Sequence, residues 1–343
     1  MSVSIIIKSL NEEGRIAAAI ESALAALPAP DGEVIVVDSG SSDRTVEIAR
    51  RYPVLVVQLA NLDERCCGVG PQLGYQLARG SCICLIDGDM ELDADFLRQA
   101  VAFLETHPGY AGVAGRVEET NLESLEFARR VRRAPADLDA GEVDRLNGGG
   151  LFRRAAIEEV GYFTDRNLHG YEELDLAARL RARGWRLRRL DLPFVRHYGH
   201  ALNAYRLLWR RWMGGYVLGL GQVVRASLGK KHAEIVLRLS EIRLWAAVAA
   251  SWVVSLLLVL LSPSWGAGLA LAVLVQALPV LVMSVRYRSL AMGFYAVVAW
   301  HVHTLGFIAG LLRRRRDPAA PVEGRILSDG RLKRPVDHDT AAN

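Results

Sequence analysis

The sequence has few cysteines and little excess of either charge, and both shortages narrow the possible functions. Its 343 residues include four cysteines, at positions 66, 67, 82 and 84, and their spacing fits no zinc-binding pattern. We therefore expect reduced thiols in a cytosolic domain. The formal net charge is only +4, so charge alone does not indicate a nucleic-acid-binding protein, and no nucleic-acid partner is expected.

Signals for secretion and for a dinucleotide cofactor are also missing. The N-terminus enters an apolar run at once, without a basic segment or a cleavage site, so no signal peptide is expected. No G-x-G-x-x-G follows the first predicted strand, which disfavours a Rossmann dinucleotide site. Composition instead divides the chain, because residues 1–241 mix charged and apolar residues whereas residues 244–312 are mostly apolar.

The first half alternates short apolar runs with helical patterns, which is typical of α/β proteins. The predicted strands are residues 3–7, 34–37, 54–59 and 81–86, and the predicted helices are residues 11–27, 42–51 and 72–78. This order predicts a mostly parallel sheet with right-handed crossovers. Asn11 is a candidate cap for the first of these helices.

Polar residues follow these strands, and the carboxyl ends of parallel strands share one sheet edge, where ligands bind. Asp87-Gly88-Asp89 follows the fourth strand. Its carboxylates suit a hard divalent cation, which usually brings substrate phosphates with it, although an acidic turn has the same composition. Asp38, after the second strand, is placed either to accept hydrogen bonds from a base or ribose or to start a glycine-rich turn.

Two later segments carry further candidates. Residues 148–150 are three glycines before an apolar pair, and glycines let a backbone approach a ligand closely; a flexible loop is the alternative. Glu172 and Glu173 begin a predicted helix, where acidic residues suit the helix dipole, and Gly184 can end that helix. Taken alone, these acids are better explained as ordinary helix-end charge.

Four segments, taken in order, resemble the family 2 glycosyltransferases, which have the GT-A fold. Residues 5–13 are similar to the opening strand and Asn-Glu-Glu turn of that family, and residues 36–45 to its nucleotide-binding segment. Residues 85–89 resemble its metal motif, and residues 172–179 its acidic catalytic helix. The resemblance covers roughly residues 3–200. It implies an α/β protein with a Rossmann-like GT-A domain, which moves one sugar from a nucleotide sugar to an acceptor hydroxyl with inversion.

The resemblance also implies roles for individual residues. The nucleotide sugar would be bound by the following residues: Ser9, Asn11, Glu13, Asp38, Ser39, Asp87, Gly149 and Gly150. Asp89, helped by Asp87, would hold Mg²⁺ or Mn²⁺ on the diphosphate. His197 would complete the metal shell, with a partly buried structural histidine as the alternative. Glu173 would be the general base and Glu172 its neighbour or acceptor contact, and two acids this close would raise one pKa.

The sequence departs from the family pattern in several places. Lys8-Ser9-Leu10 stands where Pro-Thr-Tyr is common, so position 10 offers no aromatic ring to stack on the base. Residues 67–74 lack the usual Arg-Asn, and the acidic pair is Glu-Glu rather than Glu-Asp. Residues 208–212 keep the Arg-Trp of processive synthases without their Gln, which indicates single addition rather than polymerisation.

The second half contains membrane-type segments. Residues 244–262 and 266–285 carry no charge and are long enough to cross a hydrocarbon core of about 30 Å. Basic residues before the first and after the second place both ends on one side, which the positive-inside rule assigns to the cytoplasm together with the catalytic domain. We therefore expect a multi-pass protein of the inner (cell) membrane. A buried helical hairpin in a soluble protein is the alternative.

Three neighbouring segments are less clear from sequence. Residues 291–312 are long enough to span, but a third crossing would place the arginines at 313–316 outside, so a re-entrant or interfacial segment is the alternative. Residues 201–243 contain an amphipathic stretch with Trp and Arg, expected to lie in the membrane interface unless its aromatic stripe packs in a core. Residues 313–343 are expected to form a basic, disordered tail.

These expectations define a domain plan and a function. The plan is a GT-A domain at residues 1–200, an interfacial region at 201–243, membrane helices at 244–312 and the tail. The function is transfer of one sugar, from a UDP-sugar by default, to a lipid-linked saccharide acceptor in polysaccharide or cell-envelope glycan assembly. Synthesis of a polyprenyl-phosphate sugar is the alternative within enzymes. A non-catalytic membrane scaffold or nucleotide-binding subunit is the alternative of another class.

Overall fold

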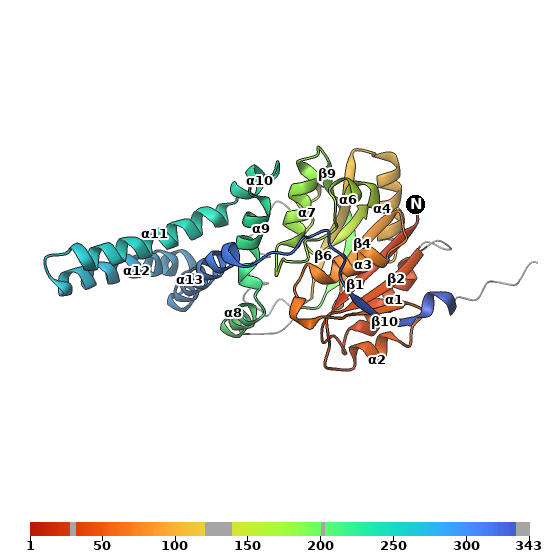
Figure 1. The fold of residues 1–343 in the computed structure, drawn as a ribbon, viewed down its shortest axis with the longest axis horizontal. Coiled ribbons are helices and arrows are strands. Elements are labelled where there is room, and N and C mark those ends of the chain that lie inside the picture. The colour runs from red at the N-terminus through yellow and green to blue at the C-terminus, as the bar shows by residue number, and fades with distance from the viewer. Residues whose placement is uncertain (28–31, 121–138, 200–202, 334–343) are drawn as a thin grey trace, which may run out of the picture. The chain divides into compact units, whose positions relative to one another are not determined.

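The computed structural model describes residues 1–27, 32–120, 139–199 and 203–333. The chain forms two compact units (Figure 1). The first contains Met1–Asn203 together with the segment from Arg315 onward, and the second contains Ala204–Arg314.

The first unit begins with a parallel sheet, as the sequence predicts. Strand β1 pairs in parallel with β2 and β4, and β2 pairs in parallel with β3. Helices connect these strands, so each crossover is a β-α-β unit. The elements are β1 (Val3–Ser9), α1 (Ile16–Ala26), β2 (Gly32–Asp38), α2 (Thr45–Ala49), β3 (Leu55–Leu59), η1 (Leu62–Glu64), α3 (Val69–Leu77) and β4 (Cys82–Asp87).

Later strands make the sheet mixed rather than mostly parallel. Strand β8 pairs antiparallel with β4 and β6, and β9 pairs antiparallel with β5 and β7 but parallel with β6. These later strands bring His197 of β9 into register with Met90 of β5, the residue that follows Asp89. The elements are β5 (Met90–Leu92), α4 (Phe96–Thr106), β6 (Tyr110–Glu119), β7 (Gly141–Glu142), β8 (Gly150–Arg153), α6 (Arg154–Glu159), α7 (Glu172–Arg181) and β9 (Arg186–His197).

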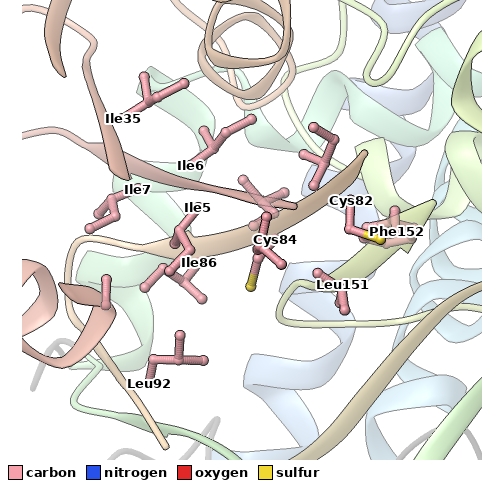
Figure 2. Packing of buried hydrophobic residues seen from close by; sticks show 14 of the residues in the cluster. Ile5, Ile6, Ile7, Ile35, Cys82, Cys84, Ile86, Leu92, Leu151 and Phe152 are labelled. Atoms are coloured by element: carbon pink, nitrogen blue, oxygen red, sulfur yellow. The ribbon is translucent and has the colours of Figure 1, made fainter. Parts of the chain in front are cut away.

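The core is built on the central strands β1 and β4. Ile5, Ile6 and Ile7 are consecutive and all fully buried, because both faces of this part of the sheet are covered. Figure 2 shows them packed with Cys82 and Cys84 of β4. All four cysteines are free, and burial raises the pKa of Cys82 to about 11. The apolar core therefore delivers Asp87 at the end of β4.

The expectation of a disordered tail is wrong for the described residues after 313. Strand β10 (Gly324–Asp329) pairs antiparallel with β3 and is followed by η4 (Gly330–Lys333); Figure 1 shows this blue strand among the red N-terminal ones. Arg331 forms ion pairs of 2.7 Å with both Glu33 and Asp329. The edge of β3 offers unpaired backbone groups, and a polar, proline-containing composition does not reveal that a strand will use them.

The second unit is helical. Helices α11, α12 and α13 are each long and apolar enough to cross a membrane, and they correspond, to within a few residues, to the three segments expected from sequence. From the turn that joins them to about their middle, α11 and α12 expose large apolar side chains, such as Leu261 at 77% and Leu274 at 60%. A buried hairpin in a soluble protein would cover such side chains. The elements are α8 (Ala204–Met213), η3 (Tyr216–Leu218), α9 (Gly219–Ser227), α10 (Ala233–Leu237), α11 (Ser240–Leu261), α12 (Trp265–Tyr287) and α13 (Leu290–Leu312).

Candidate active site

Asp38, at the end of β2, is fully buried and shapes the loop that follows it. Its Oδ2 accepts hydrogen bonds from the backbone N–H groups of Gly40 (2.9 Å) and Ser41 (3.0 Å) and from the Gln58 amide (2.8 Å). Its other oxygen accepts from the Ser41 hydroxyl. Gly40 has a φ of +90°, which favours glycine. The turn-forming role of Asp38 is therefore observed, and its contact with a base or ribose stays a prediction.

The segment after β1 is tied to the same loop. Asn11 has a φ of 58°, and its Oδ1 accepts a 2.8 Å hydrogen bond from the N–H of Ser42. The expectation that Asn11 caps the first helix is wrong, because α1 begins only at Ile16 and its N-cap is Arg15. The amide side chain joins two loops instead of closing one helix.

Three more predicted nucleotide-binding residues lie in these two loops. The carboxylate of Glu13 accepts from the N–H of Arg44 at 3.2 Å. The Ser9 hydroxyl, which is buried, donates to the carbonyl oxygen of Val37 at 3.3 Å, and the N–H of Ser39 donates to the carbonyl oxygen of Ser9 at 3.0 Å. The structure thus brings the N-terminal candidates together at one edge of the sheet.

Lys8 joins the acidic motif to the acidic helix. Its ammonium nitrogen lies 3.1 Å from Oδ1 of Asp87 and 3.2 Å from Oε1 of Glu172. Burial alone would lower the pKa of Lys8, but the two carboxylates raise it well above its usual value, so Lys8 stays charged. Sequence reasoning noted position 8 only as a departure from proline. A lysine directly after the apolar run Ile5–Ile7 was the available signal.

Glu173 is the acid of this group with the most altered proton affinity. Burial and the neighbouring Glu172 raise the pKa of Glu173 to about 7, against the lowering effect of Lys8. The N–H of Gly148 lies 3.4 Å from Glu173 Oε1, so the glycine run adjoins the acidic pair. Two adjacent acids predict such a raised pKa, and burial adds to it. A carboxylate that titrates near neutrality is suited to accept a proton.

The three glycines are explained in part by packing. All have positive φ values, of 80° at Gly148, 94° at Gly149 and 153° at Gly150. A Cβ at Gly149 would overlap the carbonyl oxygen of Leu85, and one at Gly150 would lie 2.8 Å from that of Val113. The backbone therefore approaches β4 and β6 closely, and contact of Gly149 and Gly150 with a nucleotide sugar stays a prediction.

His197 connects Asp89 to an acid that sequence reasoning missed. Its Nε2 lies 3.3 Å from Asp89, and its Nδ1 lies 2.6 Å from Glu119. Burial alone would lower the pKa of His197, but hydrogen bonds with the two carboxylates raise it to about 10. Register creates the cluster, since His197 of β9 pairs with Met90 of β5 and with Glu119 of β6. Glu119 is the last residue of β6, and no sequence motif around it marks it as a site residue.

The residue types around Asp89 fit a divalent cation. Carboxylate oxygens suit Mg²⁺ and Mn²⁺, and a neutral imidazole is an acceptable further ligand for Mn²⁺. His197 would have to release its proton before it could bind the ion. Asp87, Asp89 and His197 supply this donor set. Among the described residues, no group of three acids, histidines or cysteines is arranged to hold an ion, because Asp87 faces Lys8 and Asp89 faces His197.

Helix α7 is anchored by a buried ion pair on its inner side. Arg179 lies 2.8 Å from Asp175 and donates to the carbonyl oxygens of Tyr162 (2.7 Å) and Phe163 (2.8 Å). Asp175 is fully buried, and Arg179 is 5% exposed. The rest of the acidic motif is thus a scaffold that fixes the start of the helix, where Glu172 and Glu173 stand.

Comparisons with known proteins agree with this geometry. Residues 4–161 match the family described as Glycosyl transferase family 2, and residues 147–309 match Glycosyl transferase family group 2. Glucomannan 4-beta-mannosyltransferase 2 of Arabidopsis thaliana is 28% identical over 177 residues, which are 48% of this chain and 31% of that protein. Glucomannan 4-beta-mannosyltransferase 1 of Oryza sativa is 24% identical over 48% of this chain and 32% of its own. The chain spans about a third of the length of these curated relatives.

Solved structures share the fold. The mannosyltransferase PcManGT from Pyrobaculum calidifontis, in complex with GDP-Man and Mn²⁺, superimposes with a TM-score of 0.55 at 22% identity, over 88% of this chain and 86% of that one. TarS 1-349 from S. aureus superimposes with a TM-score of 0.51 at 17% identity, over 95% and 96% of the two chains. Together with the ordered motifs along β1, β2, β4 and α7, the two family matches establish that the chain belongs to family 2 of the glycosyltransferases.

Proposed function

We propose that this protein transfers one sugar, with inversion, from a nucleoside diphosphate sugar to a lipid-linked saccharide at a membrane surface. The process served would be polysaccharide or cell-envelope glycan assembly, in a bacterial type of cell. The observation that carries the proposal is the Lys8 ammonium, 3.1 Å from Asp87 and 3.2 Å from Glu172. One ammonium group within 3.2 Å of Asp87, proposed for the donor side, and of Glu172, proposed for the acceptor side, supports a shared site for both substrates.

On the acceptor side, Glu173 is the general base. In its deprotonated form it accepts the proton of the acceptor hydroxyl while that oxygen forms a bond to the anomeric carbon. The bond from this carbon to the diphosphate breaks on the opposite face, which gives inversion, and the electron pair leaves with the diphosphate. Because the pKa of Glu173 is about 7, the base is available at neutral pH and still holds a proton well.

On the donor side, the negative charge of the leaving diphosphate has to be neutralised. Asp89, with Asp87 and His197, would hold a Mg²⁺ or Mn²⁺ ion, which when bound neutralises negative charge on the diphosphate. Lys8 adds a fixed positive charge beside Asp87. Ser9, Asn11 and Asp38 keep the loops after β1 and β2 in the shape that would receive the nucleoside.

The nucleobase of the donor nucleotide has to be determined by assay. UDP-sugars are expected first from the sequence. The related plant proteins are mannosyltransferases, and the fold neighbour from Pyrobaculum calidifontis binds GDP-Man, so GDP-mannose belongs in the same screen. A neighbouring TarS structure holds UDP-GlcNAc.

The lipid-linked acceptor is inferred from the second unit. Helix α8 exposes Trp209 (65%) and Trp212 (40%) beside Arg206 and Arg210. Trp and Arg on one helix suit the headgroup region of a membrane. We place the protein in the inner (cell) membrane. Its first unit, called the catalytic unit below, would lie on the cytoplasmic side.

The test is a donor screen on the purified full chain with Mg²⁺ and with Mn²⁺, measuring both binding and hydrolysis of nucleotide sugars. Asp89→Ala should lose at least tenfold in hydrolysis, whereas Asp95→Ala, which removes an exposed acid paired with Arg98, should not. Undiminished hydrolysis by Asp89→Ala would refute the metal assignment. Failure to bind any nucleoside diphosphate with Mn²⁺ present would favour a non-catalytic scaffold.

A further inference from the structure

The C-terminal segment belongs to the catalytic unit, although it follows the membrane helices. Strand β10 is hydrogen-bonded to β3. Before it, Arg315 lies 2.6 Å from the buried Asp165, and Arg316 pairs with Glu64. The chain therefore leaves the catalytic unit after Asn203 and returns to the same unit at Arg315.

This return restricts how many helices can cross the bilayer. A folded unit lies on one side of a membrane, and every complete crossing moves the chain to the other side. A chain that leaves a unit and rejoins it must cross an even number of times. The second unit contains three helices long enough to span. Three complete crossings would leave the two parts of the catalytic unit on opposite sides of the bilayer. Either one of these helices does not cross, or a further segment of the second unit does.

Helices α11 and α12 have the features of a crossing pair. They form a hairpin in which the Gln276 amide donates to the Ser255 hydroxyl at 2.8 Å. Their distal halves expose apolar side chains, with Leu260 at 62% and Leu269 at 59%. Hydrocarbon is the environment that suits such a surface.

Helix α13 contacts the other end of this hairpin. The Trp252 indole N–H donates to His301 at 2.8 Å, and the Trp245 ring stacks on His303. A Cβ at Gly293 would overlap Ser284, near the end of α12. These partners lie from near the start of α11 to just past its midpoint and in the last part of α12; Figure 1 shows α13 against that part.

Helix α13 also runs along the segment from α8 to α9. The Tyr295 hydroxyl donates to the carbonyl oxygen of Ala204 at 3.3 Å. Further along, a Cβ at Gly306 would lie 2.6 Å from the carbonyl oxygen of Val217, and one at Gly310 would overlap that of Leu218. The glycines thus permit close packing on η3 from the middle of α13 to its end.

The segment beside α13 cannot itself cross. Between Arg211 and Arg225 it has about 13 uncharged residues, which as a helix reach roughly 20 Å against the roughly 30 Å of hydrocarbon. Charged side chains at both ends keep it near the surface. A helix packed along it for most of its length shares that depth.

We propose that α11 and α12 cross the bilayer as a hairpin, and that α13 lies with α8, η3 and α9 against the lipid headgroups on the side of the catalytic unit. Both ends of α13 are then on that side, and the number of crossings is two. The surface these helices offer is a platform for phospholipid headgroups. The exposed basic side chains Arg206, Arg210, Arg313 and Arg314 of this unit favour anionic ones.

Single cysteines test this topology in the full chain. The positions are Gly266 at the start of α12, Arg286 at the end of α12, Ala319 after α13 and Arg183 in the catalytic unit, all exposed. A membrane-impermeant maleimide is applied to sealed cells and again after permeabilisation, with the unsubstituted chain giving the background of the native cysteines. We expect Gly266→Cys to react from the side opposite to the other three variants.

Other patterns overturn the proposal. If Ala319→Cys reacts together with Gly266→Cys, three helices cross. If Arg286→Cys reacts from the far side while Gly266→Cys reacts with Arg183→Cys, the α8–α9 segment crosses as well. Reaction of all four from one side means that nothing crosses. Reaction after permeabilisation confirms that each thiol is accessible, and none of these readouts depends on sugar transfer.

Discussion

Glu173→Gln separates the catalytic role of this carboxylate from its effect on the fold. A positioned general base contributes about 10²- to 10⁴-fold to rate, so transfer to a hydroxyl acceptor should fall by that factor. Binding of the donor should change by less than about threefold, because the donor-side acids are untouched. In the unsubstituted enzyme the rate should rise with pH around about 7, where Glu173 loses its proton, and the variant should lack this limb.

The same variant should be more stable at alkaline pH. The pKa of Glu173 is about 7 in the folded protein and about 4.3 in an unfolded chain. The native state therefore loses stability as pH rises from the unfolded value through the folded one, because a partly buried carboxyl beside another acid must ionise. Removing that ionisation should add about 1–3 kcal/mol to the free energy of unfolding at pH 8 and almost nothing at pH 4.

The assays are acceptor glycosylation against pH and urea unfolding at pH 4 and pH 8, with the exposed Glu158→Gln as the matched control. A misfolded variant would lose activity and stability together, whereas a removed base loses activity and gains stability. Full activity of Glu173→Gln on a hydroxyl acceptor would refute the base assignment. Full activity on a polyprenyl phosphate would instead favour that acceptor, since a phosphate needs no strong base.

Three further changes test the surrounding structure. Lys8→Met should shift the rising limb of the pH–rate profile to higher pH, because Lys8 lowers the pKa of Glu173. Lys8→Arg should restore most of the original profile. Identical profiles for all three enzymes would contradict the effect of the Lys8 charge on Glu173. Gly149→Ala should lower the free energy of unfolding by about 2–4 kcal/mol, from its φ of +94° and its backbone overlap, whereas Gly161→Ala, with φ of +92° and open space, should lose only about 1–2 kcal/mol by thermal or urea unfolding. Arg331→Met should destabilise the catalytic unit by about 1–3 kcal/mol, because it leaves Glu33 and Asp329 without their cationic partner. Unchanged unfolding would show that these two ion pairs add nothing to the stability of the unit.

Much of the fold was predictable because its signals are local. The apolar runs that became β1 to β4, the acidic start of α7 at Glu172 and the three long apolar helices depend on a few consecutive residues each. The predicted and observed helix and strand boundaries differ most where a tertiary contact takes the place of an expected local one. Asn11 joined another loop instead of capping α1, and the later strands turned an expected parallel sheet into a mixed one.

The sequence by itself determined the alternation of strands and helices, the position of the acidic residues at strand and helix ends, and the length of the apolar helices. Only the tertiary structure decided which charges meet. Lys8 and Glu172 are 164 residues apart in the chain, and Glu119 and His197 are 78 apart. Such pairings depend on strand register and crossover, which local patterns do not specify. The same holds for β10, whose partner is a sheet edge that exists only after the first strands have folded.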